Sequence, residues 1–131
     1  MEHVFNIKVH SYHTDWQGIL NFGRYSEIIS EAIENAYKNL LGKMVPVWGK
    51  VTVVTKRYEI DYFKPLRFGD EVKVVLSFSI NGEHSLKVEF NIYKGEELCA
   101  KGSKILVFID IEKWIKVPIP QEVKEAIISE K

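Results

Sequence analysis

The chain has 131 residues, a length that fits one domain over residues 1–131. Hydrophobic residues make up 46% and charged residues 27%, which are ordinary globular values and argue against intrinsic disorder. Eighteen Lys and Arg residues balance eighteen Asp and Glu residues, so the basic excess of a nucleic-acid-binding domain is missing. We therefore expect a single globular domain with no nucleic acid as partner.

The only cysteine, Cys99, has no second cysteine with which to form an internal disulfide. This pattern is typical of a reducing cytoplasm and excludes a small secreted scaffold held by disulfides. No basic-then-apolar signal opens the chain, and no apolar run approaches the roughly 18 residues that cross a bilayer. We therefore expect a soluble cytoplasmic protein without a membrane partner.

The first third of the chain predicts a strand followed by one long helix. Apolar and polar side chains alternate from Glu2 to His10, which is the period of a half-buried strand. Residues 13–18 break the alternation and indicate a loop. From about Phe22 to Leu41 apolar residues recur at three-to-four spacing, which predicts an amphipathic helix of about five turns. Gly42 is the predicted stop at its C-terminal end.

The rest of the chain predicts four strands and a short terminal helix. Alternating or continuous apolar residues place the strands at 51–63, 72–80, 86–92 and 98–111. Turn residues separate them, and Asn81-Gly82 is a strong hairpin signal. The apolar run from Ile105 to Ile109 is typical of a central strand buried on both faces, or of a strand that meets a partner chain. Residues 121–128 can form one short helix.

This order predicts an α+β domain. A five-stranded antiparallel sheet wraps around one long central helix, and a short helix follows at the C-terminus. A helix of about 20 residues spans roughly 30 Å, so it covers one face of such a sheet and leaves the edges open. Open edges and patches of that size usually end in a subunit interface. We expect an even-numbered homo-oligomer, either a dimer or a homotetramer built as a dimer of dimers.

Asp15 stands out because it lies in the irregular loop between the first strand and the helix, shortly before Gly18. A carboxylate held near a helix N-terminus can work as a general base or nucleophile. Unpaired backbone N–H groups at the same helix start can polarise a carbonyl. Alternatively, Asp15 only makes a turn and caps the helix. The residues by themselves leave both interpretations open.

The loop and helix start carry a resemblance to a known family. The run Asp15-Trp16-Gln17-Gly18-Ile19-Leu20-Asn21-Phe22-Gly23-Arg24-Tyr25 resembles the signature of hotdog-fold acyl-CoA thioesterases of the 4-hydroxybenzoyl-CoA thioesterase type. That signature has an Asp, then a Gly three residues later and a Tyr ten residues after the Asp. The block 62–70 and the tail from Gly102 to Pro120 are also similar to the family, so the resemblance covers nearly the whole chain.

The resemblance implies roles for five residues. The carboxylate of Asp15 attacks the thioester carbonyl or activates water, and the backbone amide of Tyr25 holds the developing oxyanion. Asn21 positions water or substrate. Trp16 and Gly18 belong to the same substrate-binding loop. The family also implies the hotdog fold, which agrees with the order of elements predicted from the periodicity.

Two positions depart from the closest family pattern, and a third departs from the pattern of a related branch. Arg24 stands where many relatives have Asn, and His13 stands where many have a second acidic residue. Asn21 matches the first Asn of the His-Val-Asn-Asn run found in acyl-ACP-type hotdog thioesterases, but Ile19 stands where that run has His. The mixture implies thioester hydrolysis in general, leaves the acyl group open, and leaves open whether CoA or acyl carrier protein carries it.

A CoA-type ligand needs cations for its phosphates. The candidates are Lys56, Arg57, Lys64 and Arg67 around the first strand–turn corner, together with Arg24. Solubilising surface charge is the alternative explanation for them. The candidates for lining an acyl pocket are apolar residues in irregular segments, namely Trp16, Met44, Val47 and Trp48. Core or interface packing explains these apolar residues equally well.

Two further carboxylates and a histidine deserve comparison with Asp15. Glu27 and Glu31 lie one turn apart on the predicted helix, and another hotdog branch uses a helical Glu as its catalytic carboxylate. Their spacing fits a solvated polar stripe, which is the interpretation we favour. We expect His13 to be a loop residue in water rather than a hydrogen-bond partner of Asp15. The histidines show no metal-ligand spacing, so no metal site is expected.

These observations give three hypotheses. The first is a thioesterase that hydrolyses acyl-CoA without a cofactor. The second is a non-catalytic hotdog module that binds acyl-CoA as a sensor or carrier. The third is a hotdog dehydratase or hydratase of acyl thioesters. Enzymes of that class use a catalytic His. We disfavour it because Leu20 stands five residues after Asp15, where that class has His, and because the chain contains no Pro-Gly.

Overall fold

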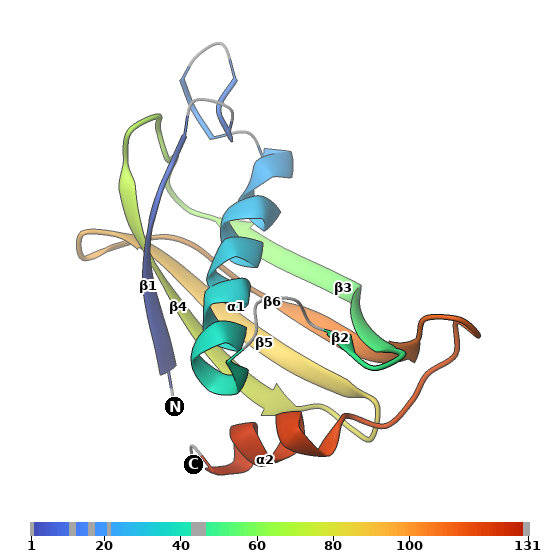
Figure 1. Ribbon diagram of the computed structural model, residues 1–131. Coiled ribbons are helices and arrows are strands. Elements are labelled where there is room, and N and C mark those ends of the chain that lie inside the picture. Colours follow the sequence, from blue (N-terminus) through green and yellow to red (C-terminus); the bar gives the residue numbers. More distant parts are fainter. Residues whose placement is uncertain (1, 11–12, 16–17, 21, 43–46, 130–131) are drawn as a thin grey trace.

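A computed structural model describes residues 2–10, 13–15, 18–20, 22–42 and 47–129. In this part of the chain one antiparallel sheet carries two α-helices (Figure 1). The elements in chain order are β1 (Glu2–Lys8), the 3-10 helix η2 (Phe22–Arg24), α1 (Tyr25–Leu41), β2 (Val47–Trp48), β3 (Val51–Tyr62), β4 (Glu71–Ile80), β5 (Ser85–Lys94), β6 (Glu97–Asp110) and α2 (Gln121–Ser129).

The predicted α+β architecture is confirmed. Five long strands and both helices lie where the periodicity placed them, and α1 runs along one face of the sheet (Figure 1). One element was not predicted, the short strand β2, which pairs with Val51 and Thr52 at the start of β3. Two residues are too few to show an alternation, so the sequence pattern could not reveal this strand.

The sheet has the strand order β1-β4-β5-β6-β3-β2, and each neighbouring pair is antiparallel. Strand β6 lies between β5 and β3, and Leu106, Val107, Phe108 and Ile109 are buried. The apolar run is therefore that of a central strand. On the other side, β3 has β2 beside only its first two residues, so residues 53–62 form an open edge among the described residues.

Helix α1 buries one stripe of residues against the sheet, as its amphipathic spacing predicts. The buried residues are Tyr25, Ile28, Ile29, Ala32, Ile33, Ala36 and Tyr37. The helix ends where it was predicted to end, because the N–H of Gly42 donates to the carbonyl of Lys38 at 3.0 Å. Its N-terminal end lies beside the 13–20 loop, where the site described next is built (Figure 1).

Gly102 is the point of closest approach in the sheet. It pairs with Ile60 on β3 and with Phe90 on β5. A Cβ atom at this position would overlap the backbone carbonyl of Glu59 and lie 2.8 Å from Cζ of Phe90. Only glycine allows the Phe90 ring and the backbone of β3 to pack this closely.

Candidate active site

Asp15 lies in a tight turn between residues 13–15 and 18–20. The N–H of Gly18 donates to the carbonyl of Asp15, and the N–H of Asp15 donates to the carbonyl of Ile19, both at 3.0 Å. The N–H of Ile19 also donates to Oδ1 of Asp15 at 3.4 Å. Gly18 has a φ of 74°, a conformation that side chains disfavour. Asp15 therefore shapes the turn, and its side chain is also exposed to solvent.

This turn rests on the corner between β3 and β4. The N–H of Leu20 donates to the carbonyl of Leu66 at 2.7 Å, and the N–H of Phe68 donates to the carbonyl of Gly18 at 2.9 Å. The loop and the corner were two separate blocks of the family resemblance. The structure brings them together at the N-terminal end of α1.

A pocket of about 340 Å³ lies between the turn, the start of α1 and the end of β3. Its lining residues are Ile19, Leu20, Tyr25, Tyr62, Phe63, Lys64 and Pro65. The exposed fractions of Tyr62 and Phe63 are 40% and 48%, which is high for large apolar side chains. Of the described residues in this lining, Lys64 alone is charged. Such a mainly apolar wall with one cation suits a ligand with an apolar body and a polar end.

Tyr25 is the first residue of α1, and its side chain belongs to the core. It is 1% exposed, and its ring lies edge-on to that of Tyr62 with centroids 4.9 Å apart. Burial raises the pKa of Tyr25 to about 12, with Cys99 and Tyr62 adding to the shift and a hydrogen bond with the Leu66 backbone opposing it. The phenol is therefore neutral at ordinary pH. What Tyr25 offers to a ligand is its position at the positive end of the helix dipole.

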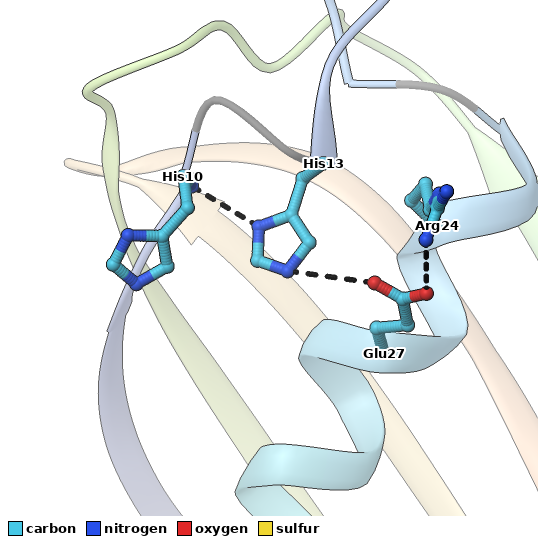
Figure 2. A network of polar contacts seen from close by, with 4 residues as sticks. All are labelled: His10, His13, Arg24 and Glu27. Carbon is cyan, nitrogen blue, oxygen red and sulfur yellow. Dashed lines mark hydrogen bonds and ion pairs between the residues drawn. The ribbon is translucent and has the colours of Figure 1, made fainter.

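His13 is buried, so the expectation of a loop residue in water was wrong. It is 5% exposed, and its Nδ1 accepts a hydrogen bond from the N–H of His10 at 3.0 Å. Its Nε2 lies 3.6 Å from Oε2 of Glu27 on α1 (Figure 2). Burial lowers the pKa of His13, and the nearby Glu27 carboxylate opposes that shift. The packing of α1 against this loop, which no local pattern encodes, accounts for the burial.

Glu27 also holds Arg24. Nη1 of Arg24 lies 2.7 Å from Oε1 of Glu27, so this carboxylate bridges a histidine and a guanidinium (Figure 2). Glu31 is exposed, as a solvated stripe predicts. Glu27 is 42% exposed and takes part in a network, so the stripe interpretation describes it incompletely. A second pocket, of about 380 Å³, is lined by His13, Ser26, Glu27, Ser30, Glu31 and Glu34.

Apart from Arg24, the predicted cations fall into two groups. Lys64 and Arg67 lie at the corner beside the pocket, where the N–H of Arg67 donates to Oδ2 of Asp70 at 2.8 Å. Lys56 and Arg57 are exposed on β3 at a bulge, and Arg57 forms an ion pair with Glu59. Tyr62 follows Arg57 by five positions along the strand, a distance of about 17 Å. One chain by itself does not bring this second group to the pocket.

Three predicted residues, Trp16, Asn21 and Met44, lie outside the described residues, and so does the side chain of Val47. Trp48 is described, and its ring packs against those of Tyr37 and Phe108 with centroids 6.5 and 5.5 Å apart. Trp48 thus has the packing role that was the alternative to lining an acyl pocket.

A family model connects this geometry with known proteins. The model of the Thioesterase-like superfamily matches residues 9–127. The chain belongs to the thioesterase-like superfamily. This match covers the Asp15 turn, α1 and all of the sheet from β2 to β6, and it confirms the predicted class of enzyme, a thioester hydrolase. None of the curated proteins matches the sequence.

Solved structures share the whole fold of this thioesterase-like chain. A 1,4-dihydroxy-2-naphthoyl-CoA thioesterase from Synechocystis is 23% identical, with a TM-score of 0.84, over 98% of this chain and 96% of that one. A DHNA-CoA thioesterase from Staphylococcus aureus is 16% identical, with a TM-score of 0.86, over 98% and 90%. A gentisyl-coenzyme A thioesterase is 23% identical, with a TM-score of 0.84, over 95% and 99%. These likenesses confirm the hotdog fold.

Tyr62 and Phe63 were not predicted as pocket residues of this thioesterase-like chain, and Lys104 was not predicted to be buried. A signal for Lys104 was available, because the alternation along β6 places it on the same face as Leu106 and Phe108. In the described residues no group of three or more His, Cys, Asp or Glu side chains is placed to hold a metal ion. No helix in this part of the chain is long and apolar enough to span a bilayer.

Proposed function

We propose that this chain hydrolyses acyl-CoA thioesters to a free acid and CoA. Asp15 is the general base or nucleophile, and the N-terminal amides of α1, including that of Tyr25, form the oxyanion hole. One observation carries the proposal. Ile19, whose N–H binds the Asp15 carboxylate, and Tyr25, the first residue of α1, line the same pocket.

The chemistry follows from where charge develops. When the thioester carbonyl is attacked, negative charge grows on its oxygen, and N–H groups at a helix N-terminus stabilise that charge. As a general base, the carboxylate takes a proton from water while the water oxygen bonds to the carbonyl carbon. As a nucleophile, a carboxylate oxygen bonds to that carbon, and water then hydrolyses the resulting anhydride. In both cases the C–S bond breaks and the CoA thiol departs.

The polar end of the substrate is assigned to the corner between β3 and β4. Lys64 lines the pocket and Arg67 is exposed nearby, so both can meet phosphate groups from solvent. Arg24 is a further candidate, although its guanidinium already pairs with Glu27. The roles of Trp16, Gly18 and Asn21 in holding the substrate follow from the family resemblance, as do those of Lys56 and Arg57 toward CoA.

We propose that the active protein is a homo-oligomer with an even number of chains. Among the described residues no strand lies beside residues 53–61 of β3 on its outer side, and a second copy can cover this edge by extending the sheet. The pocket lies at the end of this same strand, where Tyr62 and Phe63 are exposed. Light scattering of the purified protein gives the mass, and a mass of one chain would contradict this part of the proposal.

A second carboxylate deserves a test of its own. Glu27 lies on α1 beside buried His13 and lines a pocket of about 380 Å³. If Glu27 were the catalytic base, hydrolysis would survive the loss of the Asp15 carboxylate. If the chain were a non-catalytic acyl-CoA-binding module, the native protein itself would bind CoA esters without hydrolysing them. The Asp15 and Glu27 variants would then have no activity to lose.

The experiment is thiol release from a panel of acyl-CoAs that runs from acetyl to long-chain to aromatic esters. The aromatic members include 1,4-dihydroxy-2-naphthoyl-CoA and gentisyl-CoA, for which two structural neighbours are named. Asp15→Asn keeps the side-chain shape and removes the charge, and we expect kcat to fall by about 10²-fold or more. Asp61→Asn, an exposed carboxylate on β3, is the matched control. Full activity in Asp15→Asn would exclude Asp15 and direct the test to Glu27→Gln.

A further inference from the structure

Lys104 is a charged side chain in the interior of the domain. It lies on the inner face of β6, opposite Tyr58 on β3 and Val88 on β5, and is 6% exposed. Lysine is almost never buried to this extent unless its charge is paired. Its burial therefore calls for an explanation that the turn at Asp15 and the pocket beside it do not give.

The partners of Lys104 leave most of its hydrogen-bonding capacity unused. Nζ lies 3.3 Å from Oγ of Ser30 on α1 and 5.4 Å from the centroid of the Tyr58 ring. An ammonium has three N–H donors, and Ser30 accepts one of them. Among the described residues no carboxylate lies within the 4.0 Å of an ion pair. Burial accordingly lowers the pKa of Lys104.

A second polar group beside Lys104 is also unsatisfied. The hydroxyl of Tyr58 is buried and has no hydrogen-bond partner among the described residues. Buried hydroxyls normally find a partner, because leaving one unpaired costs free energy. Two incompletely paired groups on adjacent strands, both facing α1, are typical of a place where a ligand supplies the missing partner.

A cavity reaches Lys104 from the surface. It measures about 140 Å³ and is lined by Ser30, Ile33, Glu34, Tyr37, Val53, Thr55, Lys104 and Leu106. These residues come from α1, β3 and β6, so the cavity lies between α1 and the sheet on its β3 side. Glu34, which is exposed, is the carboxylate of this lining, and Lys104, which is buried, is its cation.

The cavity and the proposed reaction centre lie along the same helix. The pocket beside Asp15 also lies between α1 and β3, with Tyr25 and Tyr62 in its lining. On α1, Ser30 follows Tyr25 by five residues, which is about 7.5 Å along the helix axis. Five residues also turn the helix by about 140°, and the two linings share no residue. An acyl group whose carbonyl lies at the start of α1 therefore reaches the Lys104 ammonium only if it also occupies the space between the two pockets.

We propose that Lys104, held by Ser30, binds an oxygen at the far end of the acyl group. The preferred substrates are then acyl thioesters that carry a carboxylate, or failing that a hydroxyl, about 7 Å from the thioester carbonyl along the helix. This inference rests on the proposed function, since it places the carbonyl at Tyr25. An anion in the cavity supplies the missing charge partner, and it favours the protonated form of Lys104.

The test compares three esters with acyl chains of six carbons, hexanoyl-CoA, 6-hydroxyhexanoyl-CoA and adipoyl-CoA. They differ only at the far carbon, so their kcat/KM ratios report what that end of the cavity prefers. We expect native protein to prefer adipoyl-CoA over hexanoyl-CoA by about tenfold or more, with the hydroxyl ester between them. Lys104→Met should remove this preference, mainly through KM, and Ser30→Ala should reduce it.

Two controls separate recognition from folding. Lys87→Met changes a half-exposed lysine on β5 next to Val88, the cross-strand partner of Lys104, and should leave the ratio as in native protein. Thermal unfolding of Lys104→Met should show an unchanged or higher midpoint, because a buried unpaired charge is removed. A ratio that Lys104→Met does not change, or a native preference for hexanoyl-CoA, would overturn the inference and leave the proposed hydrolysis standing.

Failure of the proposed hydrolysis can also be distinguished from failure of the Lys104 site. If no ester is hydrolysed, calorimetric titration of the same three esters measures binding alone. Tighter binding of adipoyl-CoA that is lost in Lys104→Met would support the Lys104 site and reject the hydrolysis. Equal affinities for the three esters would reject the Lys104 site as well.

Discussion

Nε2 of His13 lies 3.6 Å from Oε2 of Glu27, and this contact joins the loop after β1 to the first turn of α1 (Figure 2). The other ring nitrogen accepts a hydrogen bond from the N–H of His10, so Nδ1 carries no proton. The imidazole is therefore neutral in the folded chain, with its proton on the nitrogen that faces Glu27. Protonation of Nδ1 would break the hydrogen bond that fixes the loop.

This arrangement predicts how stability depends on pH. Burial lowers the pKa of His13 below its ordinary value of 6.5, so near and below that pH the unfolded chain binds more protons than the folded chain. The contribution of His13 is complete above pH 6.5 and is lost as the pH falls from there toward the folded pKa. We expect the urea midpoint to fall between pH 7 and pH 5.

The variant His13→Asn isolates the part that belongs to this histidine. Its side-chain oxygen can accept the hydrogen bond from His10, and it does not titrate. The fall in the urea midpoint should be smaller in this variant than in native protein. His3→Asn on β1 is the control, and an identical pH profile for native protein and His13→Asn would contradict the prediction.

The Asp15→Asn variant should separate chemistry from structure. An Asn oxygen can still accept the N–H of Ile19, so we expect the free energy of unfolding to change by no more than about 0.5 kcal/mol. The activity should nevertheless fall by about 10²-fold or more. Urea unfolding and thiol release on the same preparations test both statements. A large loss of stability would show that the carboxylate is needed for the turn.

Two tyrosines allow a matched comparison of buried hydroxyls. Tyr25 has a hydrogen bond with the Leu66 backbone, and the hydroxyl of Tyr58 has no partner among the described residues. Tyr25→Phe should lower the free energy of unfolding by about 0.5–1.5 kcal/mol. Tyr58→Phe should leave it unchanged or raise it, because an unpaired buried hydroxyl is removed. Chemical unfolding at pH 7 measures both, and equal losses in the two variants would contradict this.

Gly102→Ala should be among the most destabilising single changes. The new methyl group would overlap the Glu59 carbonyl and the Phe90 ring, so β3 or β5 must move. We expect a loss of about 1–3 kcal/mol, as for other overpacked interiors. Ser103→Ala, the next residue on β6 and on its opposite face, is the control. Similar urea midpoints for the two variants would contradict this prediction and would show that the strands move apart at Gly102 at little cost in free energy.

The elements of the fold could be predicted because each has a period of its own. The alternation along β4 and the three-to-four spacing of α1 are repeated often enough to define their ends to within about three residues, since a short 3-10 helix occupies 22–24 before α1. The Asp15 turn was found in another way, through a short run that resembles a family signature. The features that the sequence did not predict depend on which distant segments pack together. His13 is buried because α1 packs over its loop.

The pocket residues illustrate the same limit. Tyr62 ends a strand and Phe63 begins a turn, and nothing local indicates that both lie beside Tyr25. That position depends on hydrogen bonds between the 18–20 loop and the 66–68 corner, which are far apart in the chain. Lys104 could be predicted in part. The alternation of side chains along β6 predicts that Lys104 points inward, but it does not predict the cavity beside this residue.

Cys99 gives the molecule a built-in reporter. Its side chain is fully buried, burial raises the pKa of its thiol, and its carbonyl accepts the N–H groups of Phe63 and Lys64 beside the pocket. A thiol of this kind reacts with disulfide reagents only when the surrounding structure opens. The rate of its labelling in native protein therefore measures how often this corner opens, and slower labelling in the presence of an acyl-CoA would indicate that the ligand holds the corner closed.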